Sequence, residues 1–137
     1  EAWAREWMVV ATRSGEETRG YGPRVGRSST ADRRGILGVH PVSEGCPARL
    51  TRVVGDKPWP AMLVLQTIGD EDGDFVLLVR ANGIPLARTQ SIGGRQEWQE
   101  LGFDLRPLAG KPYLLEIEVH NSGWWWEHAY FDEIVLK

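Results

Sequence analysis

Hydrophobic and polar residues alternate with a period of two along the clearest segment of the chain, residues 113–120. Its odd positions are apolar, whereas its even positions include Glu116, Glu118 and His120. Successive side chains of a β-strand point to opposite faces, so this pattern predicts a half-buried strand whose even positions face solvent. The last segment, 130–136, alternates in a similar way and predicts a second such strand.

Other segments predict further strands and the turns between them. Met62–Ile68 and Phe75–Val79 are nearly continuous apolar runs, which suit central strands covered on both sides. Asn82-Gly83 predicts a type I′ hairpin turn, because both turn positions need positive φ. Asp104–Ala109 predicts one helical turn, with Asp104 as N-cap and Gly110 as the stop. The remaining strands are expected at Trp7–Thr12, Ile36–His40, Leu50–Val54, Ile84–Thr89 and Trp98–Asp104.

Eight or nine short strands separated by turns predict an all-β fold, an antiparallel β-sandwich of jelly-roll type with helix below about 15% of residues. A length of 137 residues suits a single domain. Residues 1–35 are expected to form an irregular N-terminal part, and residues 36–137 are expected to contain the core strands.

Strand direction predicts which connections share an end of the sandwich. If consecutive strands from residue 36 onward run antiparallel, alternate connections emerge at the same end. One end then receives connections 42–47, 69–73, 91–96 and 121–128. The other end receives connections 55–60, 82–83 and 105–112.

Composition narrows the classes of partner and chemistry. The 16 Lys and Arg residues are scattered and the net charge is −3, so we expect no nucleic-acid partner. No apolar run approaches the roughly 20 residues of a membrane helix. The lone Cys46 excludes an internal disulfide and a multi-cysteine zinc site, and we expect it to be buried and inert. The chain has no nucleophile elbow, P-loop or dinucleotide fingerprint, so we expect no enzyme.

Three successive tryptophans form the most informative segment, Asn121-Ser-Gly-Trp-Trp-Trp-Glu127-His128. Neighbouring side chains face opposite ways, so all three cannot enter one core, and at least one is expected at the surface. An indole can stack on a pyranose while Asn121 and Glu127 reach its hydroxyl groups. In the alternative interpretation, two of the tryptophans plug the open end of the sandwich. Trp59, between two prolines, is expected at the opposite end, either exposed or packed at the edge.

A group of acidic residues falls at the same end as the tryptophans. Asp70, Asp72 and Asp74 alternate around Gly73 as in the first half of a calcium-binding loop, although Phe75 and Ala81 depart from that pattern. The alternative is a solvated hairpin turn, with no metal cofactor. Asp70, Asp72 and His128 are also candidate ligand contacts. His40, His120 and His128 share this end without any known metal-ligand spacing.

From about Ile36 onward the chain resembles galactose-binding-like jelly rolls, in particular the carbohydrate-binding-module-like domains of large secreted bacterial proteins of planctomycete type. The matching stretches are Ile36–Pro41, Pro47–Leu50, Gly73–Val79 with Asn82-Gly83, Phe103–Gly110 and Trp126–Ile134. In such modules the loop before the last strand contributes an aromatic and an Asn or acid, which here implies Asn121, Trp124, Trp126 and Glu127. A structural calcium on the last strand would fall to Asp132 or Glu133.

These observations predict a non-catalytic module that binds a polysaccharide or oligosaccharide through exposed tryptophan. The chain begins at Glu1 without a signal peptide, so we expect an excised, monomeric part of a larger secreted, extracellular bacterial protein, in contact with its other domains. The alternative is a structural or protein-interaction domain that packs against a catalytic partner domain and has no sugar ligand.

Overall fold

A computed structural model describes residues 6–10, 12–13, 16–17, 24–26, 36–39, 46–69, 74–87, 90–92, 97–120 and 129–137. Most of these residues lie in strands, and a 3-10 turn, η2 (Arg106–Leu108), precedes β12. The strands are β1 (Met8–Val10), β2 (Thr12–Arg13), β3 (Glu16–Glu17), β4 (Arg24–Gly26), β5 (Ile36–Val39), β6 (Ala48–Val54), β7 (Met62–Gly69), β8 (Phe75–Ala81), β9 (Ile84–Pro85), β10 (Gln90–Ile92), β11 (Gln99–Asp104), β12 (Tyr113–His120) and β13 (Ala129–Leu136).

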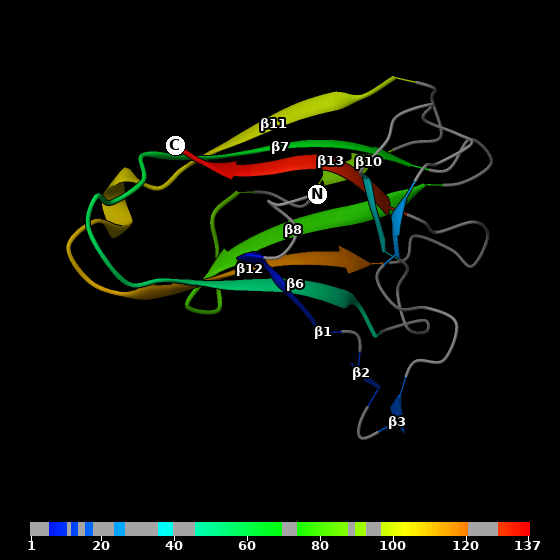
Figure 1. Cartoon of the computed structure of the whole chain (residues 1–137), viewed down its shortest axis with the longest axis horizontal. Helices are drawn as coiled ribbons and strands as arrows, with labels where there is room; N and C mark the ends of the chain where they lie inside the picture. Colours follow the sequence, from blue (N-terminus) through cyan, green and yellow to red (C-terminus); the bar gives the residue numbers. More distant parts are fainter. Residues whose placement is uncertain are drawn as a thin grey trace.

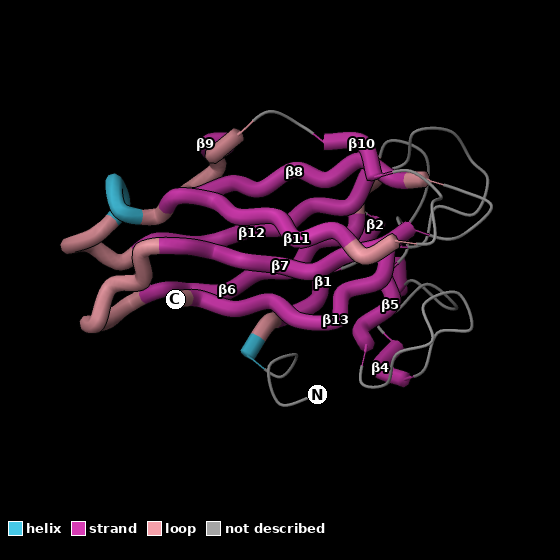
Figure 2. Tube along the Cα trace, turned by 90° about the horizontal axis from the view of Figure 1, so that it is seen from above, coloured by secondary structure: helices cyan, strands magenta, loops and turns pink. Residues whose placement is uncertain are grey.

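Two antiparallel sheets pack face to face (Figure 1). One has the order β1-β6-β12-β8-β10, with β9 added beside β8, and the other has the order β11-β7-β13-β5-β4. Figure 2 shows the long strands of both sheets running along the long axis of the molecule. From β5 onward the chain passes repeatedly from one sheet to the other, so the predicted β-sandwich of jelly-roll type is confirmed.

The core lies between the inner faces of the two sheets. In β12, the odd-numbered Leu115, Ile117 and Val119 are fully buried, as the alternation predicts. They belong to one continuous apolar cluster with residues of the opposite sheet such as Leu65 and Phe131. Each buried side chain of this size contributes about 1.5–3 kcal/mol relative to an exposed one, so these inward positions stabilise the packing of the two sheets.

The predicted turns occur where the sequence places them. Asn82 and Gly83 have φ values of 48° and 79°, which confirms a turn with two positive φ angles. The Asn82 side chain also accepts a hydrogen bond from the Leu114 backbone N–H at 2.9 Å, which ties the turn to β12. The predicted helical turn is η2, although its N-cap residue is Leu105. Asp104 instead accepts a bond from the Arg106 backbone N–H at 3.0 Å.

Three local predictions are changed by the structure. Of the predicted strand Ile84–Thr89, β9 covers Ile84 and Pro85, Leu86 and Ala87 lie outside it, and residues 88–89 are outside the described residues; β10 follows as a separate edge strand. Cys46 is half-buried rather than buried. Part of the N-terminal segment joins the sandwich, because β1 pairs with β6 and β4 pairs with β5. No helix within the described ranges is long and apolar enough to cross a membrane.

Candidate functional site

One end of the sandwich collects the strand ends that border the predicted ligand-binding connections (Figure 1). Gly69 at the end of β7 pairs with Ala129 at the start of β13. His120 at the end of β12 pairs with Val76 of β8. Ile92 pairs with Phe75, and Gln99 pairs with Thr67. The prediction that 69–73, 91–96 and 121–128 share one end is therefore confirmed for the strand ends that flank these connections.

The structure describes few of the predicted site residues themselves. Connections 70–73 and 121–128 lie outside the described residues, and with them the predicted contacts Asp70, Asp72, Asn121, Trp124, Trp126, Glu127 and His128. Of the proposed calcium ligands, Asp74 is described and is half-buried immediately before β8. Within the described ranges, no three His, Cys, Asp or Glu side chains come together as a metal site.

The two carboxylates implied by the resemblance lie in the middle of the last strand. Glu133 is exposed and Asp132 is half-buried, and both lie at a register shift in the pairing of β13 with β7. A β-bulge of this kind re-aims neighbouring side chains. The calcium role implied for Asp132 or Glu133 stays a prediction.

A buried carboxylate near the same end of the sandwich departs from the sequence prediction. Glu118 was expected to face solvent, yet it is only 3% exposed. Its side chain lies on the outer face of β12, where the Nε atoms of Arg49 and Arg80 donate hydrogen bonds to its two oxygens. His120 Nε2 lies 3.4 Å from Glu118 Oε2. The side chains of Arg49, Arg80 and His120 cover the carboxylate. We call these three residues together with Glu118 the Glu118 cluster.

The Glu118 cluster keeps its carboxylate ionised. Burial raises the pKa of Glu118, but the hydrogen bond from Arg80, the nearby His120 and the hydrogen bond from Arg49 together lower it below the ordinary value. The arginines come from β6 and β8, the two strands that flank β12. The cluster therefore ties three adjacent strands together just before β12 ends at His120.

No sequence signal identifies this cluster directly. Arg49 and Arg80 lie 69 and 38 residues from Glu118, and only the strand order and register bring them beside it. Alternation correctly placed Glu118 on the outer face. It could not show that neighbouring side chains cover that position.

Comparison with known sequences yields little. No family model matches the chain. A protein of Methanosarcina acetivorans described as a hypoxanthine/guanine phosphoribosyltransferase is 32% identical over 84 residues, which covers 61% of this chain and 39% of that protein. Because the chain spans about two fifths of this relative, the match carries no conclusion about activity.

Solved structures are more informative. A CBM51 module from Clostridium perfringens GH95, in complex with methyl-galactose, gives a TM-score of 0.58 at 10% identity over 85% of this chain and 80% of that one. TmCBM61 in complex with β-1,4-galactotriose gives 0.56 at 15% identity, covering 96% and 87%. CBM36 in complex with calcium and xylotriose gives 0.54 at 11% identity, covering 95% and 99%. The chain has the β-sandwich fold of carbohydrate-binding modules.

The strands form the scaffold of this fold, and the connections join their ends. Functional residues of β-sandwiches concentrate in such connections, because rigid strands hold their ends at fixed separations. Here His120 is paired with Val76 of β8, and Ala129 is paired with Val39 of β5 and Gly69 of β7. The connection that joins His120 to Ala129 is the one with three tryptophans.

Proposed function

We propose that this chain is a non-catalytic carbohydrate-binding module of a larger secreted protein, with its ligand at the end bordered by Gly69, His120 and Ala129. Trp124 or Trp126 would stack on a sugar ring, while Asn121, Glu127 and His128, with Asp70 and Asp72, would supply polar contacts. The single observation that carries the proposal is the fold, which matches modules solved with methyl-galactose and β-1,4-galactotriose.

Two further points support the location. The strand ends around 70–73 and 121–128 meet at one end, so acidic and aromatic residues far apart in sequence have neighbouring anchor points. Sugar recognition needs this combination, an apolar platform with polar groups that converge on hydroxyls. Catalysis forms no part of the proposal, because the sequence lacks the motifs of nucleophilic catalysis.

Replacing the stacking tryptophan should remove most of the sugar affinity. An indole stack contributes on the order of 1–2 kcal/mol, so Trp124→Ala or Trp126→Ala should weaken binding about 5- to 30-fold. Trp125→Ala is the matched control, because in an extended chain its side chain would point away from those of its two neighbours. Calorimetric titration of methyl-galactose, β-1,4-galactotriose and xylotriose into each variant provides the measurement.

Thermal melts on the same variants separate binding from folding. If the tryptophans plug the core instead, each replacement should destabilise the domain by about 3–5 kcal/mol. Three variants that all unfold, or three that all bind normally, would contradict the proposed site. A wild-type domain that binds no glycan on a broad array would favour the protein-interaction alternative.

Calcium can be tested separately from sugar. If Asp70, Asp72 and Asp74 hold the ion, free calcium at 100 times its Kd should stabilise the fold by about 2.7 kcal/mol through mass action. EDTA should then lower the Tm and added calcium should restore it, whereas Asp72→Asn should abolish the response. A melting curve insensitive to both EDTA and calcium would leave the solvated hairpin turn as the explanation of this segment.

A further inference from the structure

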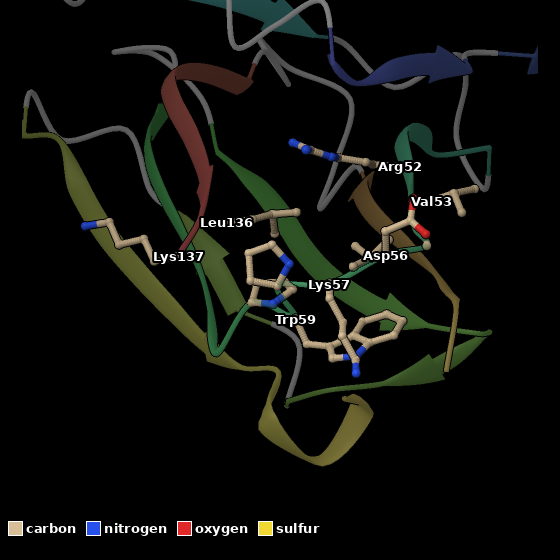
Figure 3. Close-up of a pocket in the computed structure, with 11 residues that line it drawn as sticks. Arg52, Val53, Asp56, Lys57, Trp59, Leu136 and Lys137 are labelled. Carbon is tan, nitrogen blue, oxygen red and sulfur yellow. The ribbon is translucent and has the colours of Figure 1, made fainter. Parts of the chain in front are cut away.

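A pocket opens at the end of the sandwich opposite to Gly69, His120 and Ala129 (Figure 3). It has a volume of about 410 Å³ and is lined by residues 52–60 together with Leu136 and Lys137. This volume lies within the ~300–1,000 Å³ typical of small-molecule pockets. The segment 55–60 joins β6 in one sheet to β7 in the other, so the pocket lies where the chain crosses between the sheets.

Trp59 forms a supported aromatic wall of this pocket. Its ring stacks on Tyr113 at 6.5 Å between centroids and 26° between planes. Tyr113 is 4% exposed and belongs to the core, so it backs the indole firmly. Pro58 and Pro60 flank Trp59 and restrict the backbone on both sides. The indole is thus held in place before any ligand arrives, which reduces the entropy lost on binding.

Polar groups near the indole lack protein partners. Trp59 Nε1 and the Tyr113 hydroxyl are both buried and have no hydrogen-bond partner in the described part of the chain. An unsatisfied buried donor costs about 1–3 kcal/mol. Both atoms are closed off from solvent and Tyr113 is not among the lining residues, so a ligand in the pocket meets the half-buried Trp59 ring and the rim rather than these two groups.

The backbone beside the pocket is fixed. The Lys137 carbonyl accepts hydrogen bonds from the N–H groups of Ala61 and Met62 at 2.6 and 3.0 Å. The Lys137 N–H in turn donates to the Met62 carbonyl at 2.9 Å. The segment that carries Trp59 is therefore anchored to the end of β13, and the two walls of the pocket keep their separation.

One cation of the rim, Lys57, is placed to pair with an anionic group of a ligand. Arg52 is occupied, since it donates to Glu6 Oε2 at 2.5 Å and lies over the Trp7 ring. The Lys57 and Lys137 ammonium groups have no ion-pair partner among the described residues. In the view of Figure 3, the Lys57 ammonium lies by the Trp59 ring and that of Lys137 points away. Asp56 is the only carboxylate side chain among the lining residues.

We infer that this pocket is a second saccharide site, specific for a sugar that carries an anionic group, either a uronate carboxylate or a sulfate ester. The sugar ring packs on Trp59 and its anionic group pairs with Lys57. The site deepens the proposed function, and rests on it for the ligand class, but uses residues at the other end of the fold. With both sites, one module could bind a charged polysaccharide at two places along its chain.

The test compares D-galacturonate and galactose 6-sulfate with neutral galactose, by calorimetric titration into the intact chain. The acidic sugar that fits should bind up to about fivefold more tightly than galactose, and rising salt should weaken only the acidic sugar. Lys57→Gln should remove about that fivefold advantage, as an exposed ion pair allows at most. Lys57→Arg should retain it. Lys111→Gln, an exposed lysine outside the lining, is the matched control for general charge effects.

Trp59 variants test the aromatic wall. Trp59→Phe keeps a ring on Tyr113 and should weaken the acidic sugar severalfold, with a melting curve reported alongside to exclude unfolding. Equal binding of acidic and neutral sugars, or equal loss in Lys57→Gln and Lys111→Gln, would overturn the inference. Loss of the acidic sugar in Trp124→Ala or Trp126→Ala, with no loss in the Lys57 and Trp59 variants, would do so too and leave the proposed function standing. If the neutral and the acidic sugar both lose affinity in Trp59→Phe and both keep it in Trp124→Ala and Trp126→Ala, the proposed tryptophan-loop site is refuted instead.

Discussion

Glu118→Ala should destabilise the domain by about 3 kcal/mol, at the lower end of the range for breaking a buried ion pair. The replacement removes the buried acceptor of Arg49 and Arg80 and leaves a gap on the outer face of β12. The cost stays at the lower end because the side chains of Arg49 and Arg80 are 47% and 32% exposed and can turn to solvent. Urea unfolding at pH 7 measures the effect.

Glu118→Gln and Glu116→Gln complete the set of variants. Glu118→Gln keeps the shape and one acceptor but loses the charge, so it should cost about half as much as Glu118→Ala, as expected for charge-assisted bonds roughly twice as strong as neutral ones. Glu116 lies two residues earlier on the same face and is half-buried. Glu116→Gln should stay within about 0.5 kcal/mol of wild type.

The effect of Glu118 should depend on pH in a defined direction. Its pKa in the folded state is below the ordinary value of 4.5, so its stabilising contribution is present above pH 4.5 and is lost as pH falls. The stability difference between wild type and Glu118→Gln should therefore shrink as the pH falls below about 4.5. A difference that stays constant over this range would show that the ionised carboxylate is not what stabilises the cluster.

Phe75→Ala should have a comparable or larger effect, about 3–5 kcal/mol, because it removes a large side chain and leaves a cavity. Phe75 is fully buried at the start of β8 and pairs with Ile92 of β10. A loss of this size is a large fraction of the 5–15 kcal/mol that stabilises a typical domain. Chemical denaturation followed by tryptophan fluorescence would measure it.

Ile84→Ala is the matched control for Phe75→Ala. Ile84 lies in β9 beside the end of β8 and is 68% exposed, so its truncation should change the free energy of unfolding by less than about 0.5 kcal/mol. Similar losses for Phe75→Ala and Ile84→Ala would contradict the placement of the core between the two sheets.

Phe75 also lies close to the 70–73 connection in sequence. Loosening of this strand end should therefore weaken sugar binding in Phe75→Ala under conditions in which the domain is still folded.

Most of the architecture follows from local patterns in the sequence. Alternation over residues 113–120 identified β12 and its inward face, because a strand exposes its two faces with a period of two. Asn82-Gly83 located a hairpin turn, because these residues tolerate positive φ. Counting strand directions then placed the ends of β7, β12 and β13 at one end of the sandwich, without knowledge of the strand order.

What the sequence alone could not determine are contacts that depend on strand order and register. Arg49, Arg80 and Glu118 lie in three separate strands, and their meeting follows from the order β6-β12-β8, which no local pattern reveals. Trp59 was equally consistent with exposure and with edge packing until its stack on Tyr113 became visible. Secondary structure is determined by neighbours within a few residues. Burial on an outer face, and the wall of a pocket between two sheets, depend on residues brought together only when the sheets assemble.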